Sequence, residues 1–412
     1  MYLSGSKWNM RKKRRHTNPW RVLLLLVLIA SAIYFLRFVV PTVPTPFVHT
    51  PTPTRSPASY VLEAESLFQS GKLGQAEESY RKAIAVDPEE PAFYVALARL
   101  QVFQGKFVEA ETNARNALLL QPDLPLAHAV LGWALDFQGG DKLVEAQSAV
   151  ERALELDPNL ALAHAYYAEI LMDNDLGNYE AALLAAQKSA ELDPNLLESH
   201  RALGYVWERT QNYDRALQEY QTALRINPNL GMLHLAVGNM ALNQEDTNGA
   251  IDSYLKASTL NPESTDPLTL IALAYARVGE YGKASQYAAN AVEKDPANAV
   301  LHGDLGRMYY KNNEYALAVE ELTLAVRGGT TAGGVRVEGL PLDAGSRKVV
   351  EFFYTYGLAL AKSHTCELAT EIFQALLRAV PDDEVAVTNA TEGLVLCGVI
   401  EPTPTPRPTR AP

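Results

Sequence analysis

Cysteine is nearly absent from this chain, which has 412 residues and only two thiols, Cys366 and Cys397. Two cysteines are too few for a disulfide framework, and a zinc site needs more ligands at closer spacing. A single disulfide between them and a pair of free buried thiols both stay open.

Catalytic motifs are missing as well. The sequence contains no H-E-x-x-H, C-x-x-C or G-x-S-x-G pattern, so it offers neither a metalloprotease helix nor a nucleophile elbow. The glycine-rich residues 328–334 lack the Gly-Lys-Ser/Thr of a phosphate-binding loop. We therefore expect no catalytic residue, no metal, no cofactor and no small-molecule substrate, and we expect that the protein is not an enzyme.

Positive charge is scarce beyond the first residues. Residues 1–21 hold seven of the 36 basic residues and no acidic one, so 29 basic residues face all 48 acidic residues in the remainder. A nucleic-acid partner would need a basic face. The acidic body therefore argues against nucleic-acid binding.

One long apolar run covers residues 22–40 and is interrupted only by Arg37. At ~1.5 Å per residue this run reaches about 28 Å, enough to cross a bilayer core. The basic residues just before it predict a cytoplasmic N-terminus, residues 1–21, with the body of the protein outside. A cleaved signal peptide is the alternative, because Ala30-Ser31-Ala32 resembles a cleavage site.

Proline and threonine dominate two further segments, residues 41–57 and 399–412. Such segments cannot pack a core, so we expect an extended linker and a disordered tail. The linker is either a plain spacer or a glycosylated stalk.

Prolines recur at intervals of 34 or 36 residues. A proline cannot continue a helix, so each one marks the end of a helix and the start of a new one. Small residues precede each proline at fixed offsets of twelve and five, which lets two helices pack closely. The marks are Pro88, Pro122, Pro158, Pro194, Pro228, Pro262 and Pro296.

The unit so defined resembles the tetratricopeptide repeat, two antiparallel helices in about 34 residues. The fifth unit carries the motif best, in the order His200, Leu203, Gly204, Trp207, Ala216, Tyr220, Ala223 and Pro228. The resemblance, to a membrane-anchored bacterial type, implies an all-α fold: a right-handed superhelix of about nine helix-turn-helix repeats over residues 58–398. A transmembrane helix would precede it, and a C-terminal capping helix would close it.

The repeats are interrupted once, by an insertion at residues 328–346. Val335–Val337 and Leu340–Leu342 flank Glu338-Gly339, which predicts a small β-hairpin.

The cysteines lie in the last helices that this pattern predicts. Cys366 should begin the second helix of the ninth repeat, and Cys397 should end a capping helix over residues 383–397. Antiparallel packing would bring them together, so a disulfide is feasible and would contribute about 3 kcal/mol.

Histidine recurs at one position of the repeat and invites a metal or haem hypothesis. Successive repeats lie ~10 Å apart, so two such histidines cannot share one ion. We expect instead half-buried, hydrogen-bonded side chains at the contact between helices, at His128, His164, His200, His234 and His302.

The resemblance also implies that the first helix of each unit lines a concave groove. Aromatic and charged residues at the groove positions would bind an extended or helical partner segment; Trp133 and Tyr205 could instead pack between helices. The family's Lys/Asn clamp for a C-terminal carboxylate is missing here. The candidates are Arg99, Phe103, Trp133, Asp136, Glu169, Asp173, Arg201, Tyr205, Glu208, Asn239, Asn243, Arg307 and Tyr310.

These observations predict a membrane-anchored scaffold or adaptor that binds a partner protein or peptide. The alternative is a cell-surface spacer that binds envelope glycan or neighbouring chains.

Overall fold

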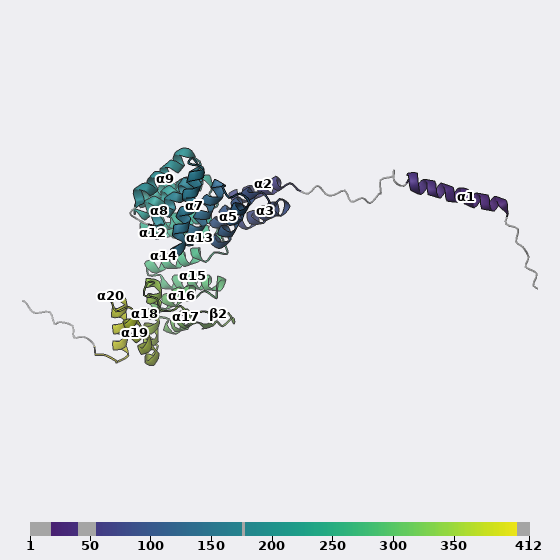
Figure 1. The fold of residues 1–412 in the computed structure, drawn as a ribbon. Helices are drawn as coiled ribbons and strands as arrows, with labels where there is room; N and C mark the ends of the chain where they lie inside the picture. The colour runs from purple at the N-terminus through teal and green to yellow at the C-terminus, as the bar shows by residue number, and fades with distance from the viewer. Residues whose placement is uncertain (1–17, 40–54, 175–177, 402–412) are drawn as a thin grey trace, which may run out of the picture. The chain divides into compact units, whose positions relative to one another are not determined.

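The computed structural model describes residues 18–39, 55–174 and 178–401, in two separate units, 1–55 and 56–412. In the first unit, α1 (Pro19–Tyr34) continues into a π-helical turn, η1 (Phe35–Val39) (Figure 1). The Asn18 side chain caps α1 by accepting a hydrogen bond from the backbone N–H of Trp20 at 3.1 Å. The helix Pro19–Phe38 is long and apolar enough to cross a membrane, a test that an N-terminal signal sequence also passes.

The second unit is a run of nine helical pairs, which confirms the predicted solenoid (Figure 1). A short 3-10 turn, η3 (Gly140–Lys142), lies in the longer third repeat. The pairs are α2 (Pro57–Gln69) and α3 (Leu73–Val86), α4 (Pro91–Phe103) and α5 (Phe107–Leu120), α6 (Pro125–Asp136) and α7 (Leu143–Leu156), α8 (Ala161–Asn174) and α9 (Tyr179–Leu192), α10 (Leu197–Arg209) and α11 (Tyr213–Ile226), α12 (Gly231–Asn243) and α13 (Thr247–Leu260), α14 (Asp266–Arg277) and α15 (Tyr281–Lys294), α16 (Ala299–Lys311) and α17 (Tyr315–Arg327), and α18 (Arg347–Lys362) and α19 (Cys366–Ala379).

A last helix, α20 (Glu384–Leu396), follows the ninth pair and packs against both of its helices. The predicted linker 41–57 and tail 399–412 lie outside the described residues, except for 55–57 and 399–401.

Small residues allow the two helices of a pair to touch. A Cβ atom added at Gly204 would come within 2.8 Å of the Tyr220 ring, and one at Gly238 would come within 2.4 Å of the Tyr254 ring. Both tyrosines are almost fully buried. The first helix therefore needs a glycine where the aromatic ring of the second helix packs.

The five repeated histidines share one hydrogen bond, from Nε2 to the carbonyl oxygen of the proline six residues earlier. Because a carbonyl only accepts, Nε2 carries the proton. These bonds join the start of each first helix to the turn before it. The pairs are His128 with Pro122 (2.8 Å), His164 with Pro158 (2.9 Å), His200 with Pro194 (3.1 Å), His234 with Pro228 (2.9 Å) and His302 with Pro296 (3.0 Å).

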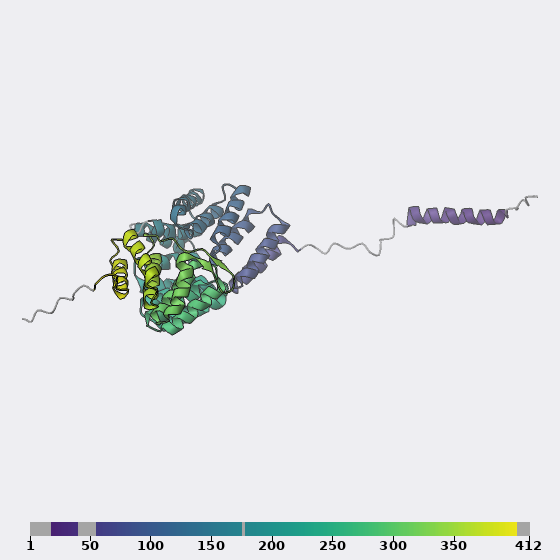
Figure 2. The same ribbon diagram turned by 90° about the horizontal axis from the view of Figure 1, so that it is seen from below.

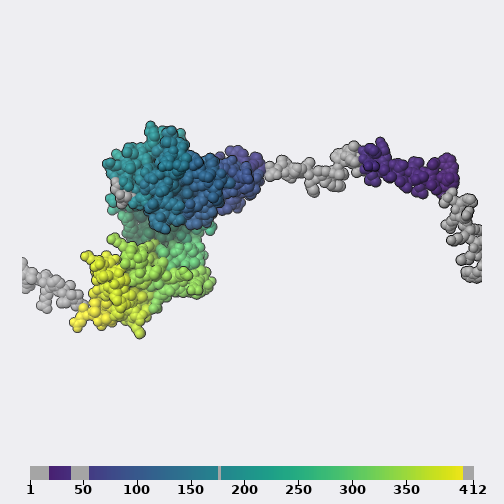
Figure 3. All heavy atoms as spheres, viewed as in Figure 1, coloured from purple at the N-terminus to yellow at the C-terminus, as the bar shows by residue number. Residues whose placement is uncertain are grey.

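The solenoid curves so strongly that its first repeat touches its sixth. The side chain of Asn229, before α12, donates to the carbonyl oxygen of Gln69 in α2 at 2.8 Å. Asn227 donates to Phe68 at 3.4 Å and is fully buried. Figure 2 shows the ring of helices that this closure produces, and Figure 3 shows the later repeats, green to yellow, extending beyond it.

The insertion forms a β-hairpin, in which the predicted strand at residues 335–337 is confirmed and the predicted strand at residues 340–342 is wrong. β1 (Gly329–Thr330) pairs antiparallel with β2 (Arg336–Val337), so Thr330 lies opposite Arg336. Residues 340–342 do not pair, because the backbone N–H of Leu340 bonds to Ala325 in α17 at 2.8 Å. Leu340, which the sequence pattern assigned to the second strand, therefore bonds to the end of α17.

The two cysteines form a disulfide with Cα atoms 5.4 Å apart. Cys366 begins α19, and Cys397 directly follows α20. The bond ties the last helix to the ninth repeat, which has a neighbouring repeat on one side only.

Candidate functional site

The inner face of the curve is lined by the first helices of the pairs, and Trp133 of α6 lies at its centre. Its ring is fully buried and stacks on Tyr166 of α8 at 4.4 Å between centroids. Phe103 and Phe137 contact it edge-on at 5.1 and 5.9 Å. Trp133 and Phe103, both predicted groove residues, are therefore packing residues between consecutive first helices.

Arg201 of α10 reaches across two repeats to this aromatic cluster. Its guanidinium lies 4.7 Å from the centre of the Trp133 ring and forms an ion pair with Glu169 of α8. Trp133 Nε1 donates to the same carboxylate at 3.2 Å. A guanidinium stacked on aromatic faces and paired with a carboxylate is held firmly in one orientation.

Beside this ion pair lies a cavity of about 220 Å³, which we call the acidic cavity. Among the described residues, four carboxylates line it, those of Asp136, Glu169, Asp173 and Glu208, and Arg201 is the one cationic side chain. Seven of the thirteen predicted groove residues line this cavity, and Trp133 donates a hydrogen bond to one of them, Glu169. The rest of the lining is Phe137, Tyr205, Tyr220, Met232, Leu233, Leu235, Ala236 and Asn239.

Burial raises the pKa values of three of these acids, Asp136, Glu169 and Glu208. Burial raises the pKa of Glu169 to about 7, although the Arg201 guanidinium opposes the shift. Burial, with the nearby Asp173 and Glu169 carboxylates, raises the pKa of Asp136 well above its usual range. Burial also raises the pKa of Glu208, against its hydrogen bond from Tyr220. The cavity thus favours either a proton or another cation.

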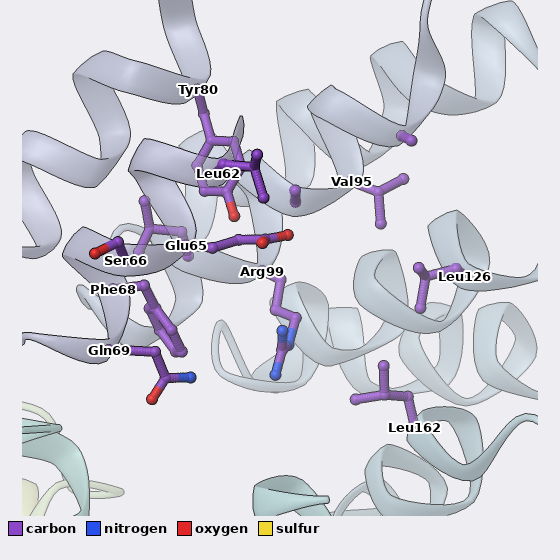
Figure 4. A pocket seen from close by; sticks show the side chains of 13 residues that line it. Leu62, Glu65, Ser66, Phe68, Gln69, Tyr80, Val95, Arg99, Leu126 and Leu162 are labelled. Atoms are coloured by element: carbon purple, nitrogen blue, oxygen red, sulfur yellow. The ribbon is translucent and has the colours of Figure 1, made fainter. Parts of the chain in front are cut away.

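A larger cavity, of about 530 Å³, opens at the N-terminal end of the groove. Figure 4 shows Arg99 of α4 between Phe68 on one side and Leu126 and Leu162 on the other. The Arg99 Nε donates at 2.6 Å to Glu198, a fully buried residue of α10. This ion pair joins the second repeat to the fifth across the inside of the curve.

The remaining predicted residues lie apart from the two cavities or at their edge. Asn239 lines the acidic cavity and accepts a hydrogen bond from Tyr254 at 2.8 Å. Asn243, one helical turn further along α12, is exposed. Arg307 and Tyr310 belong to α16, where Arg307 pairs with Glu351 at 2.6 Å and Tyr310 contacts Tyr315.

Sequence reasoning missed several residues that shape the groove. Glu198, Leu126 and Leu162 occupy the second position of their repeats, a groove position, so the repeat register could have identified them. No sequence signal pairs Glu198 with Arg99, because 99 residues separate them. Within the described residues, no group of three His, Cys, Asp or Glu side chains is placed to hold a metal ion.

Comparison with known proteins gives one family. Models described as tetratricopeptide repeat match residues 67–134, 197–230 and 269–332. No curated protein sequence matches the chain.

Two solved structures are similar in fold. The crystal structure of the APC/C hetero-tetramer Cut9-Hcn1 has a TM-score of 0.55 at 15% identity, over 81% of this chain and 55% of that one, so the chain spans about half its length. The human IFIT1 dimer with PPP-AAAA has a TM-score of 0.51 at 18% identity, over 84% of this chain and 87% of that one. At these identities the likeness shows the fold alone. Nine consecutive helical pairs and three matching stretches of sequence show that this chain belongs to the tetratricopeptide-repeat proteins.

Proposed function

We propose that the protein is a scaffold whose groove binds a segment of a partner protein. The observation that carries this proposal is the inner face itself, where first helices from consecutive repeats present two cavities lined by aromatic, aliphatic and charged side chains. Protein–protein interfaces typically contain such side chains as binding anchors, surrounded by residues that exclude water. The similar Cut9-Hcn1 structure is a hetero-tetramer, so in that case the fold occurs within a protein assembly.

The groove does not favour an anionic ligand. Four carboxylates face the acidic cavity, and the chain as a whole carries a net charge of −12. A nucleic acid would be repelled by such a surface. We therefore propose a protein or peptide partner, and we propose neither a nucleic-acid partner nor an enzymatic activity.

The anchor is a further part of the proposal. We propose that residues 22–40 hold the protein in a membrane, with residues 1–21 in the cytoplasm and the repeats outside. Each side chain of α1 is exposed, and the mean hydropathy of the helix Pro19–Phe38 is 2.1. The Cys366–Cys397 disulfide fits an oxidising compartment.

A labelling experiment tests this topology. An impermeant thiol reagent should label the variant Thr50→Cys in intact cells, because position 50 follows the proposed span. The matched variant Ser6→Cys, on the other side of the span, should be labelled only after lysis. The reverse pattern, or loss of position 6 with retention of position 50 in the mature protein, would contradict the proposed anchor.

A capture experiment separates the scaffold from the spacer. The tagged full chain should retain a stoichiometric partner protein, and Asn243→Arg should release it, because Asn243 is an exposed groove residue whose change leaves the packing intact. Asp252→Arg, on an exposed position of the second helix α13, should retain the partner. Retention on purified envelope polysaccharide, equal for both variants, would favour the spacer instead.

A further inference from the structure

One carboxylate of the acidic cavity has no partner. Asp136 ends α6 and is only 6% exposed, yet its Oδ1 atom accepts no hydrogen bond. The Oε1 atom of Glu169, a residue 2% exposed, is also without a partner. A buried polar atom without a hydrogen bond lowers the stability of the folded protein. A ligand that bonds to these two oxygen atoms would offset that cost.

The cation of the lining, Arg201, is engaged except at its Nε atom, which has no hydrogen-bond partner. Arg201 is bound by Glu169 and by the faces of Trp133 and Phe137. Its guanidinium therefore cannot turn to Asp136 without losing these contacts.

The two remaining acids of the cavity have partners as well. Asp173 accepts the Tyr205 hydroxyl and lies 3.8 Å from Arg209. Glu208 accepts the Tyr220 hydroxyl at 2.6 Å. In the part of the chain that the structure describes, Asp136 is thus the carboxylate of the cavity that has no hydrogen bond to Oδ1 and no ion pair, and Arg201 acts on it only through space.

The part of the lining that α12 contributes is mostly aliphatic. Met232, Leu233, Leu235 and Ala236 of α12 line the cavity, and Asn239 lies at its edge. A ligand that fits both the acidic and the aliphatic parts of the lining has a cationic head and an aliphatic stem. The volume of about 220 Å³ has room for one such side chain.

A lysine fits this description better than the other cations. Its ammonium is a compact charge with three donors on a four-carbon stem, so one ammonium can bond to the carboxylates of two residues, here Asp136 and Glu169. An arginine fork suits two oxygens of one carboxylate instead. A metal ion is disfavoured, since no three acidic or histidine side chains among the described residues are grouped to ligate one.

We propose that the acidic cavity binds the ammonium group of a lysine side chain carried by the partner segment. This inference rests on the proposed function and names the chemistry of its partner. Asp136 and Glu169 would accept from the ammonium, and the α12 wall would cover the methylene stem.

Methionine NMR of the full chain in detergent provides the test. The chain has six methionines, so its ¹³C-methyl spectrum is simple, and Met232 reports from the wall of the cavity. The probe is a capped five-residue peptide, Ala-Leu-Lys-Leu-Ala, compared with the same peptide carrying Nε-acetyl-lysine. The lysine peptide should shift the Met232 resonance saturably, and acetylation should weaken binding at least ~10-fold, because it removes the charge.

Three variants keep the test specific. Asp136→Asn should weaken the lysine peptide at least ~10-fold, and Asp136→Glu should restore part of the affinity. Asp252→Asn removes an equal charge at an exposed position of α13 and should change nothing.

The inference fails if Met232 does not shift saturably, if both peptides bind equally, or if Asp136→Asn binds like the wild type. Each of these results leaves the proposed scaffold standing, because the peptide test needs no natural partner. The capture experiment decides that broader proposal separately.

Discussion

At the scale of single residues, Trp133 shows why a groove position is not always a binding position. Its repeat register places it on the inner face, but Phe103, Phe137, Tyr166 and Arg201 cover it completely. The register predicts which helix face a residue occupies. It cannot predict how tightly neighbouring first helices close over that face, because this depends on the curvature of the whole stack.

Truncating Trp133 should therefore destabilise the fold. We expect Trp133→Ala to lower the free energy of unfolding by about 3–5 kcal/mol, since it opens a cavity in a dry aromatic cluster. Urea unfolding followed by circular dichroism measures the loss. The control Leu119→Ala changes a side chain that is 81% exposed and should cost less than about 0.5 kcal/mol. A loss below about 1 kcal/mol for Trp133→Ala would contradict the packing described here.

Asp136 should show the opposite behaviour. Its buried carboxylate lacks a partner for Oδ1, and near pH 8 it faces the Glu169 and Asp173 carboxylates. We expect Asp136→Asn to raise the free energy of unfolding by about 1 kcal/mol at pH 8, because it removes an unpaired buried charge. Equal or lower stability in the same urea assay would mean that Asp136 has a partner in the folded protein.

At the scale of helices and strands, the helix boundaries could be predicted because residues within each repeat determine them. The recurring prolines correctly mark the ends of seven of the nine second helices, α3 to α15, and the small residues correctly mark where paired helices touch. One strand of the hairpin was predicted at the wrong residues, because the strands are only two residues long. A local pattern cannot show that Leu340 bonds to α17 in preference to a second strand.

The disulfide should stabilise the last helices selectively. Breaking it with Cys366→Ser and Cys397→Ser should cost about 3 kcal/mol, since the bond closes a loop of about thirty residues. Hydrogen exchange should then accelerate in α19 and α20 and stay unchanged in α6 and α8. Uniform acceleration along the chain, or none, would show that the bond does not act locally.

At the scale of the whole molecule, long-range contacts close the curve, and the sequence contains no sign of them. The Arg99–Glu198 pair and the Asn229–Gln69 hydrogen bond join residues 99 and 160 positions apart. These contacts depend on the summed rotation of five repeats. The sequence motif of a single repeat does not predict this total rotation.

A double-mutant cycle tests the Arg99–Glu198 closure. Arg99→Met leaves the fully buried Glu198 carboxylate without its cation and should cost about 3–5 kcal/mol. Adding Glu198→Met should recover most of that loss, because the pair is then replaced by two apolar side chains. Additive losses in urea unfolding would show that the two residues do not interact.

Stability should also depend on pH in a defined direction. The pKa of Glu169 is ordinarily 4.5 and is raised by burial to about 7, so the folded state binds an extra proton between these values and stability rises as pH falls from 8 toward 5. The Glu219 carboxylate raises the pKa of His200, which acts in the same direction: its contribution is present below the ordinary value of 6.5 and is lost at higher pH. His234, whose pKa burial lowers, opposes them.

Thermal unfolding checks this expectation. We expect the Tm to be higher at pH 5.5 than at pH 8 by roughly 2 °C or more. Glu169→Gln should flatten the difference. A higher Tm at pH 8 would contradict the burial of these acids.

Site-specific photo-crosslinking is the most direct test of the central claim, that the inner face of the curve receives a partner protein. A photo-reactive amino acid at Asn243 reports from the inner face, and one at Val144, which is 74% exposed on the second helix α7, reports from outside it. Our account predicts one discrete crosslinked protein from position 243 and none from position 144. The same product from both positions, or a product from position 144 alone, would contradict it.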